Sequence, residues 1–379
     1  MNPQNVSFAE LEHWLARTPI VAEVHPLLPL CLDAETQIIT DARHLIHRLD
    51  DRRDTVEGQV LIVDQNPDAR SRFPMFRSAA HPPVDAINRN ISSHLDYVRS
   101  HLVTSRTVAQ YVAADVERRC PNTVVLFLVD GLSYGDVLGW KCASLQPCFV
   151  DGPSVTYRFV EDEGRSVNPE VGFAGVVNRP SIFSRLHELG YTHARGYTYW
   201  TPGSNEIADY MFDGIPYRRV ANFDSVLRSI EGEVFPPGSY LQIVREGLDG
   251  LAHGKRELSR LEIESATDAI GQDIDRLLSA LGKGDGTVSL YLTADHGVLW
   301  KTEHPWELMD QVKGDHPRYA ENRPPESVLD RAVRIVSAEK PYYLWRYPYL
   351  GAHIPANDSG VHGGLSYQES IVPLAIFRE

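Results

Sequence analysis

Three aspartates and three histidines stand beside apolar runs of this 379-residue chain, where polar side chains are costly unless they have partners. Each lies near a glycine, which lets the backbone turn tightly. Carboxylate oxygens and imidazole nitrogens together suit zinc, manganese or a similar divalent ion. Because six such groups exceed the needs of one tetrahedral ion, we expect two ions that share one site. The six residues are Asp130, Asp249, His253, Asp295, His296 and His362.

The apolar runs predict the strands that must position these side chains. Residues 123–129 form a continuous β-branched and aliphatic run, which is typical of a strand buried on both faces. Residues 239–244, 287–293 and 371–377 are further strand candidates, and residues 269–281 carry the apolar stripe of an amphipathic helix. Alternating strands and helices indicate an α/β domain with helices on both faces of a sheet. In such sheets, functional side chains gather beyond the carboxyl ends of the strands.

Each of these polar motifs also has an ordinary structural explanation. An aspartate after a strand commonly caps a turn or a helix. Asp249 and His253, four residues apart, fit the solvated face of a helix, and His362 fits a turn in its glycine-rich loop. Asp295-His296-Gly297 is more informative, because two adjacent polar groups after an apolar strand need partners. The motifs together, in their order along the chain, favour a common site.

That order resembles the alkaline phosphatase superfamily, and it is most similar to the nucleotide pyrophosphatase/phosphodiesterases and to the PglZ domain family. The resemblance covers residues 120–379, and it implies an alkaline-phosphatase-like three-layer sandwich with a mostly parallel central sheet. Residues 301–361 would be an inserted specificity element, and residues 1–119 a mixed, largely helical N-terminal extension. The matching segments are Asp130, Pro153-Ser154-Val155-Thr156, Asp249-x-x-x-His253, Asp295-His296-Gly297, His362-Gly363-Gly364-Leu365-Ser366 and Ile371-Val372-Pro373, of which the last two are specifically PglZ-like.

The resemblance implies a role for each residue. Thr156 would be the nucleophile that attacks phosphorus, giving a phosphothreonine intermediate and net retention at phosphorus after two displacements. One ion, zinc or alternatively manganese, would bind to Asp249, His253 and His362. The other ion would bind to Asp130, Thr156, Asp295 and His296.

The segment around the nucleophile departs from the phosphodiesterase pattern. Tyr157-Arg158-Phe159 stands where those enzymes usually have Phe-Pro-Asn, and the asparagine that helps to hold the phosphoryl group has no clear match. Ser154 and Ser133 therefore remain alternative nucleophiles.

Residues 301–361 place several arginines beside aromatic residues, a combination that can clamp a phosphate and stack a base. We predict Arg318, Arg323 and Arg346 as substrate-binding residues. The alternative is a solvated helix followed by a strand that packs into the core.

Composition narrows the class of partner. A formal net charge of −14 argues against indiscriminate nucleic-acid binding, which depends largely on lysine and arginine. It leaves a phosphate substrate open, because two bound cations reverse the field locally. The four cysteines form no CxxC pair, the N-terminus lacks a signal-peptide pattern, and no apolar run approaches the ~20 residues of a membrane span. We therefore expect a cytoplasmic protein with reduced thiols and no membrane partner.

The leading hypothesis is a metal-dependent phosphodiesterase that acts on nucleotide or nucleic-acid phosphodiesters. The resemblance to PglZ proteins implies a role in bacterial phage defence (BREX systems), with protein partners from such a system. A phosphomonoesterase of the same superfamily, a manganese mutase or phosphotransferase, and a catalytically weak PglZ scaffold are the alternatives.

Overall fold

A computed structural model describes residues 4–50, 58–63, 67–78, 80–153, 157–160, 163–166, 181–199, 205–212, 214–231, 233, 235–254, 257–282, 286–309, 312, 316–337, 340–351, 354 and 357–379. The chain divides into two compact units, Met1–Leu102 and Val103–Glu379. No helix of the described residues is both long and apolar enough to cross a lipid bilayer.

The smaller unit is built on a five-stranded sheet in the order β1-β5-β2-β4-β3, in which all paired strands are parallel. Ser7 and Glu10 form a capping box at the start of its first helix. We expected a mixed, largely helical region, whereas the structure has five strands here, each only two to five residues long, so their apolar runs are short. The elements are β1 (Gln4–Asn5), α1 (Phe8–Leu15), β2 (Ile20–Val24), η1 (Leu28–Cys31), β3 (Gln37–Ile39), α2 (Arg43–Asp50), β4 (Val60–Ile62), α3 (Pro67–Arg72), β5 (Met75–Ser78), α4 (Val84–Asn90), η2 (Ile91–Ser93) and α5 (Leu95–His101).

The boundary between the units lies before residue 103, not after residue 119 as expected. Strand β6 (Val103–Thr104) pairs with β8 (Ser144–Phe149) of the larger unit. Helix α6 (Val108–Arg119) buries Val108, Val112 and Val116 in the core of the same unit. Residues 95–101 and 108–119 form helices, and the second of these belongs to the larger unit because of this packing.

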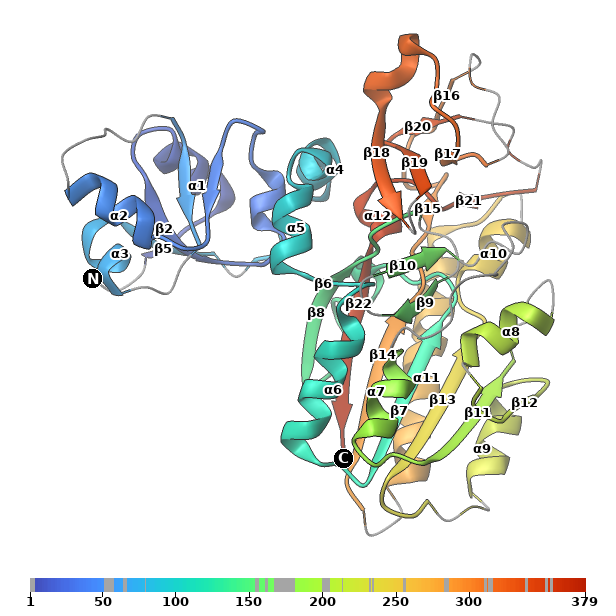
Figure 1. The fold of residues 1–379 in the computed structure, drawn as a ribbon. Coiled ribbons are helices and arrows are strands. Elements are labelled where there is room, and N and C mark those ends of the chain that lie inside the picture. Colours follow the sequence, from blue (N-terminus) through green and yellow to red (C-terminus); the bar gives the residue numbers. More distant parts are fainter. Residues whose placement is uncertain are drawn as a thin grey trace. The chain divides into compact units, whose positions relative to one another are not determined.

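The larger unit is centred on an eight-stranded sheet in the order β12-β11-β13-β7-β14-β22-β8-β6 (Figure 1). Its pairs are parallel except that β22 runs antiparallel to both neighbours. The register aligns Val129 with Arg245 and Ala294, so the residues that follow these three strands lie at one edge of the sheet. The strands not yet defined are β7 (Thr123–Val129), β11 (His193–Thr198), β12 (Tyr217–Arg219), β13 (Ser239–Arg245), β14 (Val288–Ala294) and β22 (Ile371–Arg378).

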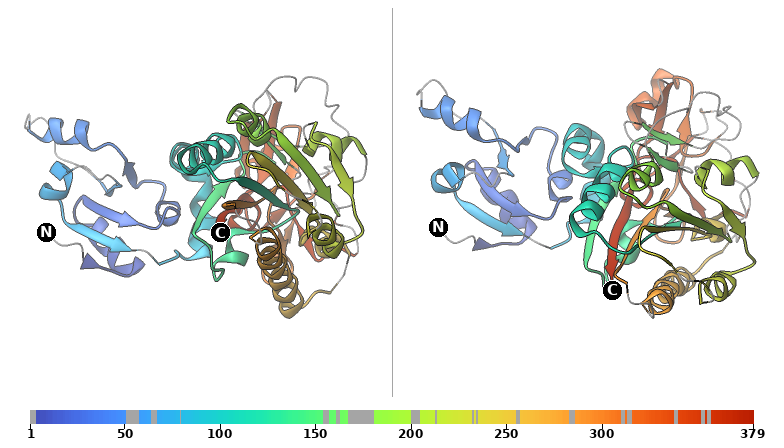
Figure 2. Two further views of the ribbon diagram at one scale, coloured as in Figure 1. Left: turned by 90° about the horizontal axis from the view of Figure 1, so that it is seen from below. Right: turned by 60° about the horizontal axis from the view of Figure 1, so that its bottom comes forward.

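Helices cover both faces of this sheet (Figure 2). Helices α6 and α7 (Ile182–Glu188) pack together on one face, and α9 (Phe223–Glu231) and α11 (Arg260–Leu281) pack together on the other. Helix α8 (Asn205–Phe212) precedes β12. The central strands are buried along their whole length, as their uninterrupted apolar sequences require. The predicted α/β sandwich with a mostly parallel sheet is therefore confirmed.

The described part of residues 301–361 forms small sheets and one short 3-10 helix, η4, which is followed directly by a strand as in the alternative that we considered. Three strands make an antiparallel sheet in the order β17-β19-β18, and Trp345 is buried beneath it. The elements here are β15 (Leu299–Trp300), β16 (Glu307–Leu308), β17 (Tyr319–Ala320), η4 (Glu326–Arg331), β18 (Ala332–Ser337), β19 (Lys340–Trp345), β20 (Tyr349–Leu350) and β21 (Gly360–Val361). Elsewhere in the unit are η3 (Tyr134–Val137), the hairpin β9 (Tyr157–Val160) and β10 (Glu163–Ser166), α10 (Asp249–Gly254) and α12 (Tyr367–Ser370).

Candidate metal centre

The carboxyl ends of β7, β13 and β14 bring Asp130, Asp249 and Asp295 to one edge of the sheet. The backbone N–H of Asp249 donates to the carbonyl oxygen of Asp130 at 3.3 Å. Gly131 makes this approach possible, because it has a φ of 74° and a Cβ there would lie 2.9 Å from the Asp249 nitrogen. The glycine after the first aspartate is thus required by geometry.

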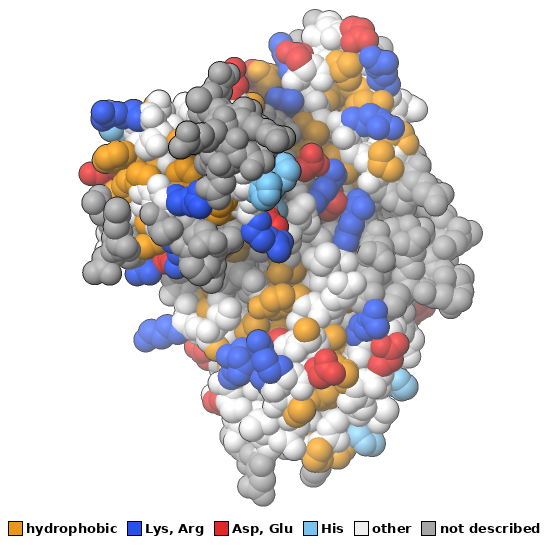
Figure 3. Space-filling view, turned by 60° about the vertical axis from the view of Figure 1, so that its left-hand side comes forward, with side chains coloured by type: hydrophobic (Ala, Val, Ile, Leu, Met, Phe, Trp, Pro, Cys, Tyr) orange, Lys and Arg blue, Asp and Glu red, His pale blue; other side chains and the backbone are white. Residues whose placement is uncertain are grey.

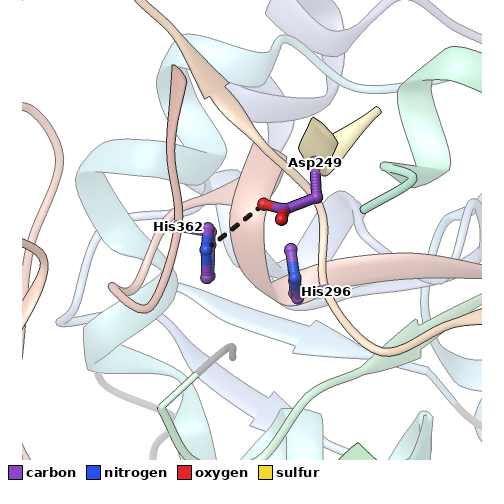
Figure 4. Close-up of side chains that lie close together, drawn as sticks. All are labelled: Asp249, His296 and His362. Carbon is purple, nitrogen blue, oxygen red and sulfur yellow. Dashed lines mark ion pairs between the residues drawn. The ribbon is translucent and has the colours of Figure 1, made fainter. Parts of the chain in front are cut away.

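Three candidate metal-ligand atoms form a nearly equilateral triangle. Asp249 Oδ1 lies 3.3 Å from His253 Nε2 and 3.3 Å from His362 Nε2, and the two nitrogens are 3.3 Å apart. Ligands bound about 2.0–2.1 Å from a tetrahedral zinc ion lie roughly 3.3–3.4 Å from one another. The triangle therefore has the dimensions of one face of a tetrahedral zinc site. Figure 4 shows Asp249 and His362 facing one another, with the ring of His296 beside them.

Asp249 Oδ1 is enclosed by protein and accepts no well-aligned hydrogen bond, although both imidazole nitrogens lie close to it. A buried carboxylate oxygen without a partner is costly. The two imidazole nitrogens lie within hydrogen-bond distance of one another, which leaves Asp249 Oδ1 unsatisfied, and a bound cation would satisfy the lone pairs of all three atoms. The residues present therefore fit a divalent ion of the zinc type.

The second predicted group of metal ligands, Asp130, Asp295 and His296, is buried more deeply than the first. His296 Nε2 lies 3.4 Å from Asp130 Oδ1 and 4.0 Å from Asp295 Oδ1, and none of the three residues is more than 6% exposed. His296 Nδ1 lies 3.1 Å from the carbonyl oxygen of Gly297, which can only accept. Nδ1 therefore carries the proton, and the Nε2 lone pair points toward the carboxylates. This group also fits a cation.

The two groups adjoin. The rings of His296 and His362 are stacked, with centroids 4.0 Å apart and planes 10° apart. One ligand atom from each of Asp249, His296 and His362 lies within 4.8 Å of the others, and the same holds for Asp130, Asp295 and His296. All six acids and imidazoles singled out in the sequence therefore converge on one centre.

Burial and neighbouring charges shift the pKa values of two groups in this centre. Burial raises the pKa of Asp295 well above its usual value, and the carboxylate of Asp130 adds to this. Although burial opposes it, the carboxylates of Asp295 and Asp130 raise the pKa of His296 to about 10. A bound divalent ion would take the place of a proton on His296 Nε2 and supply positive charge beside both carboxylates.

Asp358 supports the first group and was missed in the sequence. Its Oδ2 lies 3.0 Å from His253 Nδ1, and the residue is only 7% exposed. A carboxylate on the far nitrogen of a ligand histidine fixes its tautomer and its ring orientation. The only sequence signal is that Asp358 comes four residues before His362, in a stretch with no regular pattern.

Arg318 is placed differently from the prediction. It is 0% exposed, and its guanidinium donates to both carboxylate oxygens of Glu369 at 2.8 and 2.7 Å and to the carbonyl oxygen of Trp345 at 3.1 Å. Glu369 in turn accepts the Gly364 N–H at 2.9 Å. Arg318 therefore supports the loop that carries His362, and its donors are occupied by internal partners.

The other two predicted substrate-binding arginines lie in different surroundings. Arg323 is exposed and pairs with Glu326 at 2.6 Å. Arg346 is half-buried, and its backbone forms a β-bridge with Leu365, just beyond the His362 loop. Its Nε is enclosed without a hydrogen-bond partner among the described residues. Of the three arginines, Arg346 is the one whose backbone adjoins the segment just after His362.

The predicted nucleophile Thr156 and the alternative Ser154 lie outside the described residues. Ser133 is described, and its hydroxyl donates to the carbonyl oxygen of Gln368 at 2.5 Å. Upstream of Thr156, Asp151 is anchored by Arg106 Nε at 2.9 Å and donates its N–H to Ser105 Oγ at 3.1 Å.

No protein-family model matches the chain, and no curated protein matches it. Among solved structures, murine ectonucleotide pyrophosphatase/phosphodiesterase 5 is 14% identical, with a TM-score of 0.45 over 66% of this chain and 87% of that chain. The human protein of the same name is 17% identical, with the same coverage and TM-score. Phosphonoacetate hydrolase from Sinorhizobium meliloti is 12% identical, with a TM-score of 0.45 over 68% of this chain and 90% of that chain.

Proposed function

We propose that this protein is a two-metal phosphoric ester hydrolase of the alkaline phosphatase superfamily, of the PglZ type, with Thr156 as its nucleophile. The observation that carries the proposal is the triangle of Asp249, His253 and His362, which has the edge lengths of a zinc-binding face and adjoins a second group of two acids and an imidazole. Two adjoining cation sites are characteristic of enzymes that displace a group at phosphorus.

The chain's residues would divide the work as follows. Asp249, His253 and His362 would hold one ion, and Asp130, Asp295 and His296 would hold the other together with Thr156. Two bound divalent ions, zinc or manganese, would lower the pKa of a hydroxyl ligand and offset negative charge on phosphoryl oxygens. The Thr156 oxygen would bond to phosphorus as one ester oxygen departs and takes a proton from water. A water molecule would then break the bond between the threonine oxygen and phosphorus, which releases a phosphomonoester when the substrate is a diester.

We infer that a phosphodiester of a nucleotide or nucleic acid is the substrate. Arg346 supports this, because its enclosed Nε lacks a partner close to the His362 loop. A net charge of −14 disfavours tight non-specific binding to a polyanion. On the face drawn in Figure 3, the described lysines and arginines are scattered among acidic and polar side chains. Recognition of the substrate would therefore depend on residues close to the metal centre. The protein would act in the cytoplasm with partners from a phage-defence system.

The experiment compares hydrolysis of bis(p-nitrophenyl) phosphate and p-nitrophenyl phosphate by purified protein, with zinc or manganese added. We expect metal-dependent hydrolysis of both, with the diester preferred at least tenfold in kcat/KM, about 1.4 kcal/mol. A smaller preference or its reversal would favour a phosphomonoesterase. Clearly substoichiometric metal and no activity on re-addition would favour a scaffold module.

A further inference from the structure

His316 carries an imidazole beside the candidate metal centre, and none of the roles proposed above involves it. It lies two residues before Arg318, at the entry to β17. Its ring meets that of His362 edge-on, with centroids 5.7 Å apart and planes 70° apart.

The ring of His316 is held on several sides. It stacks on Tyr319, with centroids 4.3 Å apart and planes 26° apart. It also lies against Gly363, where a Cβ would come within 2.7 Å of His316 Cε1 and within 3.0 Å of the Tyr319 ring. Gly363 has a φ of 109°, so the residue after His362 is glycine both for its conformation and for the space that His316 occupies. The ring is therefore preorganised beside the His362 loop.

The hydrogen bonds of His316 fix which nitrogen carries the proton. The backbone N–H of Arg318 donates to His316 Nδ1 at 3.3 Å, so Nδ1 is an acceptor and the proton is on Nε2. Arg318 is itself fixed by its buried pair with Glu369. Among the residues that the structure describes, no acceptor is placed for His316 Nε2, and this atom is not among the enclosed ones. The half-buried ring thus carries a neutral N–H donor that the described residues neither enclose nor pair, beside the ring of His362.

We propose that His316 donates a hydrogen bond from Nε2 to a non-bridging phosphoryl oxygen of the bound ester. The inference rests on the proposed function, and it assigns to His316 direct contact with the substrate. A donor that is already oriented stabilises charge that develops on such an oxygen without reorganisation, and loss of one donor of this kind typically lowers kcat by about 10²–10³. The position fits a donor for an oxygen that the two ions leave uncovered.

The test compares His316→Met, which keeps length and removes the donor, with His316→Gln, whose amide nitrogen is as many bonds from the backbone as Nε2. His193→Met is the matched control, because His193 is exposed at the start of β11, at the opposite edge of the sheet. For bis(p-nitrophenyl) phosphate we expect His316→Met to lose about 10²-fold in kcat. We expect His316→Gln to recover at least tenfold of this, and His193→Met to match the parent protein. Bound zinc and the melting temperature should stay at parent values in all three.

A second readout distinguishes contact with substrate from a structural role. The Rp and Sp phosphorothioate forms of a nucleoside 5′-(p-nitrophenyl) ester each replace one non-bridging oxygen with sulfur, a poorer acceptor. In the parent protein, sulfur at the oxygen that accepts from His316 weakens that hydrogen bond. The isomer with sulfur at this position should therefore be hydrolysed more slowly than the other isomer. In His316→Met that selective effect should shrink.

Equal kcat in His316→Met and parent, unchanged selectivity between the isomers, or a loss explained by missing zinc would each overturn the inference. A parent protein that hydrolyses neither ester with zinc or manganese would overturn the proposed function itself. An active parent with an unaffected His316→Met variant would overturn only the role of His316.

Discussion

Asp358 offers a sensitive test of the first cation site, because it acts on the ligand His253 without being a ligand. Its carboxylate accepts from His253 Nδ1 at 3.0 Å and is almost fully enclosed. The carboxylates of Asp249 and Asp358 together raise the pKa of His253 to about 9, although burial opposes this. Removing one of these charges makes the imidazole a weaker and less well-oriented donor of its Nε2 lone pair.

Asp358→Asn keeps the size of the side chain and a carbonyl acceptor for Nδ1–H but removes the charge. Outer-shell partners of this kind typically contribute 10–100-fold to metal affinity, or about 1.4–2.7 kcal/mol. We expect a loss in the lower half of that range for Asp358→Asn and in the upper half for Asp358→Ala, which also leaves Nδ1 unpaired. Asp330→Asn is the matched control, because Asp330 is exposed in η4.

Zinc affinity is measured by competition with a chromophoric chelator. Melting temperatures are also compared with and without zinc, because a ligand that binds only the folded state raises the stability of the protein as its concentration rises. Zinc affinity in Asp358→Ala equal to that of the parent and of Asp330→Asn would refute the ligand role of His253. A fall in melting temperature without zinc, as large as the fall with zinc, would show instead that Asp358 is only structural.

Three further outcomes follow from the same geometry. Thr156→Ala should abolish ester hydrolysis while leaving at least one ion per chain, measured by elemental analysis; activity near the parent value would exclude Thr156 as the nucleophile. Arg318→Met leaves Glu369 buried and unpaired, so urea unfolding should show a loss of about 3–5 kcal/mol; a loss below about 1 kcal/mol would contradict the role of this pair. Gly131→Ala places a methyl group against Asp249 at a residue with positive φ. We expect about 1–3 kcal/mol of destabilisation together with weaker zinc binding. Zinc binding equal to that of the parent protein would show that the loop can shift without cost.

Sequence patterns were sufficient for the core of the larger unit. The run at residues 123–129 is apolar at every position except its first because β7 is buried on both faces in the middle of a parallel sheet. The order of Asp130, Asp249, Asp295 and His362 along the chain was informative because parallel strands end at a common edge. The apolar patterns of the strands and the topology of the parallel sheet both place these residues at the same edge, so the sequence alone was enough to predict that the six acids and imidazoles share a site.

Long-range pairing set the limit of what the sequence could predict. Asp358 contacts His253 across 105 positions, and its surroundings have no periodicity from which the contact could be inferred. Arg318 stands among basic and aromatic residues that suggest an exposed binding surface, yet its partner Glu369 is 51 positions away and buries it. His316 was not singled out at all, because its importance comes from Tyr319 and the His362 loop closing around its ring.

The most direct measurement is zinc anomalous scattering from a crystal of the protein grown or soaked with zinc. Our account predicts two peaks: one bound to Asp249, His253 and His362, and the other to Asp130, Asp295 and His296. Well-ordered side chains at both groups with no anomalous peak at either, at zinc concentrations that support hydrolysis, would contradict a two-cation centre.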